Sequence, residues 1–456
     1  MNKGDSRLHI LGKEKIPKAL LSLGIPAIIG MLVNAVLLVI DTFFLGIIGT
    51  SAIGATAIAF PLFMFIGAMG LTFGVGAASY VSRLLGQNKR EQANQTATVA
   101  FVTSALTALL VSLTGLLFLD EILILLGASD SILPLAREYS RVLIMGAMFT
   151  MLNMCMNNLL RAEGSARISM IGMSIAALAN IILDPIFIFL LHQGVAGAAQ
   201  ATVLAQIISF AVLFSYFLRK KSLLRIKRRN FKPSKIIYGE IMKIGFPTLI
   251  RQALVSIAMG MVNVCAALYG DAAVAAMGII TRVFSLPLYV MFGYNQGFQP
   301  LAGYNFGAGL FSRLKEAIRV SLKWSSIFSL TISTLFFFGS GIIIGVFSRD
   351  PQVIAIATRG LKFYSLFFPF MGFIISYNGL CQALGYAGEA MVLSLSRQGL
   401  FLIPALLILS SQKGLTGILM AQPLADGLTL LLTIALTFQI HRKIRKSERL
   451  LAERSA

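Results

Sequence analysis

Long runs of hydrophobic residues follow one another along the chain, separated by short segments rich in glycine, proline or charged residues. The runs reach or exceed about 20 residues, the length that an α-helix needs to cross the hydrocarbon core of a bilayer. The pattern predicts twelve transmembrane helices, near residues 16–48, 52–85, 94–118, 133–161, 167–191, 195–218, 237–269, 273–305, 313–346, 353–386, 390–411 and 415–440.

The composition agrees with this pattern. Of the 456 residues, 57% are hydrophobic and only 12% are charged, and the mean hydropathy is +0.83. Soluble domains carry about 25% charged residues. The expected fold class is therefore an all-α polytopic membrane protein.

Lysine and arginine are distributed unevenly among the segments between the predicted helices. One set is basic and includes the N-terminus, the segments around Lys89 and Arg161, and the end of the chain after Arg442. The alternate set, which includes 49–51 and 192–194, is poor in both residues. Because basic loops stay in the cytoplasm, we expect a multi-pass protein of the cytoplasmic membrane with both termini in the cytoplasm. The net charge of +21 then reflects topology, and no nucleic-acid partner is expected.

The densest basic run, from Arg219 to Lys243, lies near the midpoint of the chain. It predicts a cytoplasmic linker between two halves. The expected division is an N-terminal six-helix lobe (1–218), a basic linker (219–236), a C-terminal six-helix lobe (237–440) and a basic cytoplasmic tail (441–456). Anionic membrane lipids are plausible partners of such a run beside a membrane.

The two halves resemble copies of each other. Gly24-Ile-Pro26 recurs as Gly245-Phe-Pro247, 221 residues later. The same spacing relates Gly49 to Gly270, Gly76 to Gly297, Gly86 to Gly307, and Asn157 to Asn378. An even number of helices per copy gives both copies the same direction through the membrane. We therefore expect two six-helix repeats related by a pseudo-two-fold axis along the membrane normal.

Acidic residues inside predicted spans are the strongest functional signal, because a carboxylate at the bilayer centre costs on the order of 3 kcal/mol or more. Asp41, Asp184 and Thr202 each lie eight residues from the same membrane face, at roughly 12 Å depth. Asn180 lies one helical turn deeper than Asp184. These side chains could bind a proton or a small cation, and would ligate a metal ion only if that cation is sodium. Pairing of each acid with a buried base, Arg251 or Arg282, is the alternative. Asn180 and Thr202 could equally bridge helices.

Other polar residues inside predicted spans are candidates for lining a substrate cavity. They are Asn153, Asn157, Gln206, Arg251, Gln252, Gln296 and Gln299. Met173 belongs to a group of methionines that could line the cavity or simply pack between helices. Pro26 could act as a hinge or as a static kink. Asp426 could have a separate role or form a helix–helix hydrogen bond.

Enzymatic activity is not expected. The sequence has no Gly-x-x-x-x-Gly-Lys-Ser/Thr loop and no His-Glu-x-x-His motif, and its three histidines are scattered. No cofactor is expected beyond a coupling proton or sodium ion.

With two six-helix repeats, Asp41 in the first helix, and Asn180 and Asp184 in the fifth, the chain resembles the multidrug and toxic compound extrusion (MATE) family. Leu183-Asp184-Pro185 and Arg161-Ala-Glu163-Gly164 add to the resemblance. It implies two lobes around a central cavity and the exchange of protons or sodium for amphipathic, often cationic compounds. The DinF-like branch is favoured, because its cation site lies in the N-terminal lobe, matching Asp41, Asn180, Asp184 and Thr202, and its first helix bends at a proline matching Pro26.

The function predicted from the sequence is a cation-coupled antiporter that exports amphipathic compounds by alternating access. The alternative is a flippase for lipid-linked saccharides or other lipids, which would often have fourteen helices and a basic cavity. A membrane receptor that transports nothing would explain neither the duplication nor the buried acids. A monomer is sufficient for a cavity between two lobes.

Overall fold

The computed structural model describes residues 3–455, and these residues are almost entirely helical. Residues 1, 2 and 456, which belong to the expected N-terminal lobe and C-terminal tail, lie outside the described part. The first half contains α1 (Lys3–Gly12), α2 (Ile16–Ile48), α3 (Thr50–Gly86), α4 (Arg90–Leu117), α5 (Leu119–Leu125), α6 (Leu133–Met145), α7 (Ala147–Ala162), α8 (Ala166–Pro185), the π-helix η1 (Ile186–Leu190) and α9 (Gly194–Leu218).

The second half follows a segment that contains only the short 3₁₀ helix η2 (Arg228–Asn230). It contains α10 (Lys235–Ala267), α11 (Asp271–Gly307), α12 (Phe311–Phe347), α13 (Pro351–Phe367), the 3₁₀ helix η3 (Phe368–Phe370), α14 (Met371–Leu384), α15 (Ala387–Leu395), the π-helix η4 (Ser396–Leu402) and α16 (Ile403–Ser455). We call α2–α9 the N-terminal lobe and α10–α16 the C-terminal lobe.

The helices agree with the expected membrane spans. Ten helical segments of the described chain are long and apolar enough to cross a membrane, and the pair α6–α7, bent by 50°, makes an eleventh. One of the ten, 387–453, breaks at Gly414, whose φ of 58° and ψ of −137° lie outside the helical region. Counting the two sides of this break separately gives six spans in each lobe, which matches the expected twelve.

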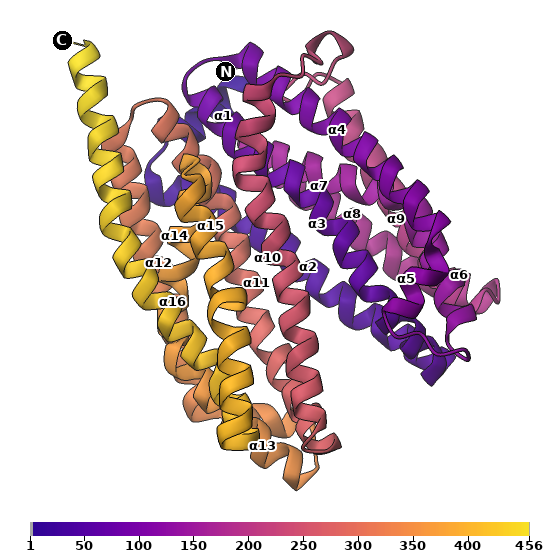
Figure 1. Ribbon diagram of the computed structural model, residues 1–456. Helices are drawn as coiled ribbons and strands as arrows, with labels where there is room; N and C mark the ends of the chain where they lie inside the picture. Colours follow the sequence, from indigo (N-terminus) through magenta and orange to yellow (C-terminus); the bar gives the residue numbers. More distant parts are fainter. Residues whose placement is uncertain (1–2, 456) are drawn as a thin grey trace.

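The two lobes meet at one end of the molecule and diverge towards the other, and both chain termini lie at the end where they meet (Figure 1). We call this end the basic end, because it carries α1, the linker 219–234 and the end of α16. The opposite end carries the turns at Gly49, Gly270 and Gly414.

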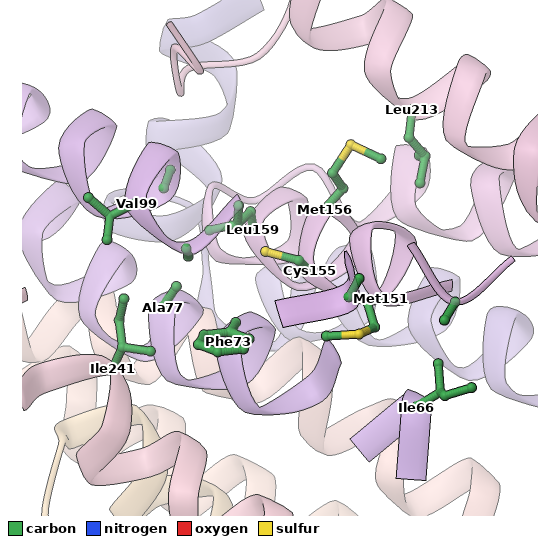
Figure 2. Close-up of a cluster of buried hydrophobic side chains, with 14 of the residues drawn as sticks. Ile66, Phe73, Ala77, Val99, Met151, Cys155, Met156, Leu159, Leu213 and Ile241 are labelled. Carbon is green, nitrogen blue, oxygen red and sulfur yellow. The ribbon is translucent and has the colours of Figure 1, made fainter. Parts of the chain in front are cut away.

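The first turns of α2 and α10 each pack into the hydrophobic core of the opposite lobe. Ile241 of α10 packs among residues of the N-terminal lobe such as Phe73 and Ala77 (Figure 2). Reciprocally, Leu20 of α2 packs with Phe298 of the C-terminal lobe. Because α2 and α10 both start at the basic end, this exchange joins the lobes there.

The repeated glycines allow this close approach. A Cβ atom on Gly86 of α3 would lie 2.1 Å from the carbonyl oxygen of Tyr304, and one on Gly307 of α11 would lie 2.1 Å from that of Arg83. A Cβ on Gly297 would lie 2.6 Å from the Cα of Gly24. Side chains at these positions would force the backbones apart, so glycine is required for the contact.

Several elements differ from those expected. The short helices α1 and α5 were not expected, because α1 is too short and polar to span a membrane and α5 falls in a segment interpreted as a loop. The helix expected at 353–386 is interrupted by η3 at Pro369, and the one at 133–161 bends at Gly146. Arg161, which we assigned to a basic loop, is 7% exposed at the end of α7.

Candidate functional site

Asp184 and Asn180 form a buried pair one turn apart on α8. The Nδ2 of Asn180 donates a hydrogen bond of 2.7 Å to one carboxylate oxygen of Asp184. Asp184 is 0% exposed, and its other oxygen, Oδ1, is buried with no hydrogen-bond partner among the described residues. The spacing of four residues accounts for the contact, because side chains at i and i+4 share one helix face.

Asp41 of α2 lies next to this pair. Its carboxyl group is close enough to that of Asp184 for the two charges to repel each other when both are ionised. Oδ1 of Asp41 is likewise buried and unpartnered in the described chain. No arginine or lysine of the described part pairs with either acid, so the alternative that each simply neutralises a buried base is wrong.

The local backbone around Asp184 is irregular. Pro185 follows it directly, and the π-helix η1 begins at the next residue. Proline has no N–H group, so the carbonyl oxygen of Ile181 loses its usual helical donor. π-helical turns inside α-helices occur frequently at functional sites. The second lobe has a π-helix, η4, in the corresponding span, without an acid at the same point.

Tyr139 of α6 is a member of the site that the sequence analysis missed. It is 9% exposed and lies close enough to Asp41 and Asp184 to interact with both charges. The sequence did not single out Tyr139, because it lies on a short amphipathic helix and tyrosine is common at membrane interfaces. Thr202 of α9 is half-buried and donates no hydrogen bond to either acid in the described structure. Asn180 is thus joined to Asp184 by a hydrogen bond and Asp41 interacts with Asp184 through its charge, whereas neither kind of contact links Thr202 to them in the described structure.

A cavity of about 390 Å³ lies at the opposite end of the N-terminal lobe. Glu138, His192 and Gln193 contribute polar groups to its wall, together with Ile48 and Val195. Glu138 precedes Tyr139 in α6, so the cavity lies on the side of the acids that faces the open end of the molecule.

A second polar group runs through the core of the N-terminal lobe. The Nδ2 of Asn153 donates to both the backbone oxygen and the Oε1 of Gln206, each at 2.8 Å. Asn157 donates to the carbonyl of Asn153 and accepts from Ser169. Three of the expected cavity residues are therefore joined in one network, and Oδ1 of Asn153 is left unpartnered in the described chain.

Arg161 closes this network towards the basic end. Its guanidinium donates to Ser169 at 2.7 Å and to Asn158 at 2.9 Å, and lies 3.9 Å from the sulfur of Met173. The sulfur of Met173 also lies 3.0 Å from where a Cβ on Gly30 of α2 would be. Met173 thus packs between the network and α2.

Pro26 lies inside α2 at the boundary between the lobes. On one side of it, Gly24 faces Tyr294 of α11, and on the other side Gly30 faces Met173 of α8. The helix continues through Pro26 from Ile16 to Ile48. The residue therefore occupies the part of α2 that both lobes contact.

The C-terminal lobe contains a different arrangement. Arg397 of η4 forms an ion pair of 2.7 Å with Asp426, which is 0% exposed and also accepts a hydrogen bond from Gln422. Asp426 therefore bridges spans, which agrees with the helix–helix interaction considered for it. Arg251 of α10 is half-buried near Arg397.

The remaining expected cavity residues lie apart from this group. Gln252 is half-buried beside Arg251 in α10. Gln299 donates to Gln382 at 3.2 Å, and Gln296 contacts the sulfur of Met31 at 3.5 Å. The two glutamines of α11 thus lie where α11 meets α14 and α2, respectively.

The helix α1 connects the two lobes at the basic end. Arg7 forms an ion pair of 3.2 Å with Glu163 and a hydrogen bond with Tyr216, both of the N-terminal lobe. The carbonyl oxygen of Leu11 accepts from Asn305 of the C-terminal lobe at 2.9 Å. Burial raises the pKa of the Glu163 carboxyl above its ordinary value, while hydrogen bonds from Ser165 and Ser222 act in the opposite direction.

The described residues contain no group of three or more histidine, cysteine or acidic side chains that could hold a metal ion. The fit at Asp41 and Asp184 is instead to a single small cation, because two carboxylates and one amide oxygen supply hard oxygen atoms. Two of these oxygen atoms are buried without a partner in the described chain, which a proton or a sodium ion would satisfy.

The sequence model of the MatE family matches the chain twice, over residues 26–186 and 247–407. The chain belongs to the MatE family. The two matched segments are offset by 221 residues, the same spacing as the repeated glycines, so the family match confirms the duplication. Members of this family are membrane transporters, and the chain is a transporter rather than an enzyme.

Curated relatives and solved structures cover nearly the whole chain. Multidrug export protein MepA of Staphylococcus haemolyticus is 31% identical over 443 residues, which are 96% of this chain and 97% of that protein. MepA of Staphylococcus aureus is 30% identical over 444 residues, with the same shares. These relatives are similar along all twelve spans, rather than over one repeat.

Among solved structures, a MATE transporter in complex with MaL6 has a TM-score of 0.91 and 25% identity, covering 96% of this chain and 99% of its own. A multidrug resistance MATE family transporter described in an outward-facing conformation has a TM-score of 0.90 and 25% identity, covering 96% and 98%. The likeness confirms the all-helical, two-lobed fold expected from the MATE resemblance.

Proposed function

We propose that this MatE family transporter is a cation-coupled antiporter that exports amphipathic, often cationic compounds. The observation that carries the proposal is the group of Asp184, Asn180 and Asp41, in which each acid has one buried oxygen atom without a partner in the described chain. A carboxylate held in a membrane protein without a basic partner is costly, so a cation from solution is the species that stabilises it. A proton or a sodium ion can fill this role.

The pair of acids supplies a coupling mechanism. When both are ionised, Asp41 and Asp184 repel each other and attract a cationic substrate towards the N-terminal lobe. Binding of one small cation removes part of the negative charge and lets the helices that carry the acids, α2 and α8, pack more closely. The cation therefore has different affinities for two arrangements of the lobe, which is what coupling requires.

The orientation of the chain in the membrane follows from the charge distribution. The positive-inside rule places the basic end, with α1, the linker and the end of α16, in the cytoplasm. The lobes meet at that end, so the conformation is closed to the cytoplasm. The acids then lie on the side that a cation enters from outside.

The substrate class is supported by the two MepA relatives, which are described as multidrug export proteins. In this chain, Asn153, Asn157 and Gln206 supply hydrogen-bonding groups in the core of the N-terminal lobe, and Met173 supplies an adaptable apolar surface beside them. We assign these residues to substrate recognition. Gln296 and Gln299 supply polar groups from α11 of the other lobe.

A flippase for lipid-linked saccharides is the second candidate. It would need basic side chains to hold a phosphate group. Arg251 is available for this role, because Arg397 is already paired with Asp426. The acidic group in the N-terminal lobe has no role in such a mechanism, so the antiporter is favoured.

The test uses purified protein in liposomes loaded with ethidium, with a pH gradient and a sodium gradient imposed separately. The antiporter predicts ethidium movement driven by one of the two gradients, and loss of this movement in Asp184→Asn. Movement of a fluorescent polyprenyl-linked saccharide, without ethidium movement under either gradient, would overturn the antiporter in favour of the flippase.

A further inference from the structure

A cavity of about 300 Å³ lies at the basic end of the N-terminal lobe, away from the acids. It is open to the outside and is bordered by α4, the end of α9 and the linker that joins the two lobes. Its wall consists of Thr98, Phe101, Val102, Phe214, Ile226, Lys227, Arg228 and Phe231. The cavity therefore combines an apolar interior with two cationic side chains.

The linker is held in place beside this cavity. The backbone N–H of Arg225 donates to Asn94 at 2.8 Å, and its carbonyl oxygen accepts from Asn230 at 2.7 Å and from Thr98 at 3.3 Å. Asn94 and Thr98 both belong to α4. Because these contacts fix the backbone before and after Lys227, the cavity wall is a defined part of the fold.

The apolar interior continues along the outside of α4. Val102 lines the cavity, and Leu106, Leu109 and Leu113 follow it on the same helix face. These leucines are 58%, 55% and 60% exposed, respectively, so this face meets the hydrocarbon of the bilayer. A hydrocarbon chain can therefore extend from the cavity into the membrane along α4.

The cationic side of the cavity carries uncompensated charge. Lys227, Arg228 and Arg229 are exposed, and none has an acidic partner among the described residues. By contrast, Lys232 lies 3.8 Å from Glu91. A phosphate group at the membrane surface would complement these charges, and the aromatic interior makes a fully hydrophilic anion a poor fit.

We propose that this cavity binds an anionic phospholipid, with its phosphate between Lys227 and Arg228 and one acyl chain along Phe101, Val102 and α4. The cavity lies where the spans end and the basic linker begins, at the depth of lipid headgroups. Lipid bound there would hold the linker against the N-terminal lobe. It would thereby restrain α10, which starts directly after the linker.

The test measures lipid retained by the full-length protein, with native mass spectrometry after exchange into detergent containing either phosphatidylglycerol or phosphatidylcholine. Each basic residue near an anionic surface contributes a several-fold preference, so Lys227→Gln/Arg228→Gln should retain phosphatidylglycerol about tenfold less. The matched control is Lys220→Gln/Lys221→Gln, which removes two exposed charges from the same linker outside the cavity. Its retention should stay within about threefold of the unmodified protein.

A further variant tests the apolar half of the site. Val102→Trp fills the cavity without changing charge, and should also lower phosphatidylglycerol retention, while the thermal unfolding temperature shows that the protein is folded. Equal losses in the two double variants would mean general surface charge and would overturn the proposal. Equal retention of phosphatidylcholine, or displacement of the lipid by inorganic phosphate alone, would overturn it as well. Retention is measured without transport, so this result is independent of the proposed antiport.

Discussion

Gly86 and Gly307 occupy equivalent positions in the two repeats, and each faces the backbone of the opposite lobe at the same distance. A Cβ on either residue would lie 2.1 Å from a carbonyl oxygen, that of Tyr304 or that of Arg83. Tyr304 and Arg83 are themselves related by the 221-residue spacing. The contact between α3 and α11 is therefore symmetric, and it joins the lobes at the basic end.

Substitution of Gly307 by alanine should weaken this contact. The added methyl group forces α11 away from α3, and overpacking of this kind costs about 1–3 kcal/mol. We expect Gly307→Ala to increase the population in which the lobes separate at the basic end, measured as a longer distance between spin labels at Lys89 and Arg442 in a cysteine-free background.

The control for this variant is in the same helix. Gly278 of α11 has no atom within 4 Å of an added Cβ, so Gly278→Ala should leave the label distance unchanged. An identical distance distribution for Gly307→Ala and Gly278→Ala would show that the glycine contact does not hold the lobes together.

Neutralisation of the buried acids should abolish coupled transport. In Asp184→Asn and in Asp41→Asn, the side chain no longer binds a cation, so we expect drug resistance to fall to that of cells without the transporter. Asp130→Asn, which alters an exposed acid, is the control. Membrane expression is measured by immunoblotting, and full resistance in a well-expressed Asp41→Asn variant would remove Asp41 from the mechanism.

The ion pair between Arg397 and Asp426 should matter for stability rather than for coupling. Removing Arg397 leaves Asp426 buried without its charge partner, which typically costs about 3–5 kcal/mol. We expect Arg397→Gln to lower the thermal unfolding temperature, and the double variant Arg397→Gln/Asp426→Asn to recover much of the loss. If the double variant recovered no stability, the interaction between Arg397 and Asp426 would not contribute to the stability of the fold.

The α1 helix should act as a connection between the lobes. Arg7→Gln breaks the ion pair with the buried Glu163, so the amides of α1 should exchange faster with deuterium, which mass spectrometry measures. Lys13→Gln removes an exposed charge from the same region and serves as the control. Equal exchange in both variants would mean that Arg7 does not anchor α1.

The spans and the duplication could be predicted from the sequence, and so could the proximity of Asp41, Asn180 and Asp184. The predicted inclusion of Thr202 in that group has no hydrogen bond to support it in the described structure. Bilayer thickness fixes the helix length, and an acid in an apolar run is conspicuous. The partner of Asp426 was missed, because Arg397 is 29 residues away along the chain and only folding brings the two together. Tyr139 was missed and Arg161 was assigned to a loop, because their residue types are ordinary at membrane boundaries and their burial depends on how α6 and α7 pack.

The role of the glycines was also outside the reach of the sequence. Their spacing indicated a repeat, but it did not show that Gly86 and Gly307 face the opposite lobe. A repeated glycine indicates that the backbone is constrained there, but it does not show which element packs against it. The sequence of the linker likewise showed its positive charge, but it did not predict the cavity with aromatic residues that the linker borders.

The most direct test of antiport is whether substrate displaces a cation from the acidic group. Ethidium is added to purified, weakly buffered protein, and proton release is recorded with a pH indicator and sodium release with radioactive sodium. We expect release of one of the two cations from the unmodified protein and from Asp130→Asn, and no release from Asp184→Asn. Undiminished release from a folded Asp184→Asn variant would contradict this expectation.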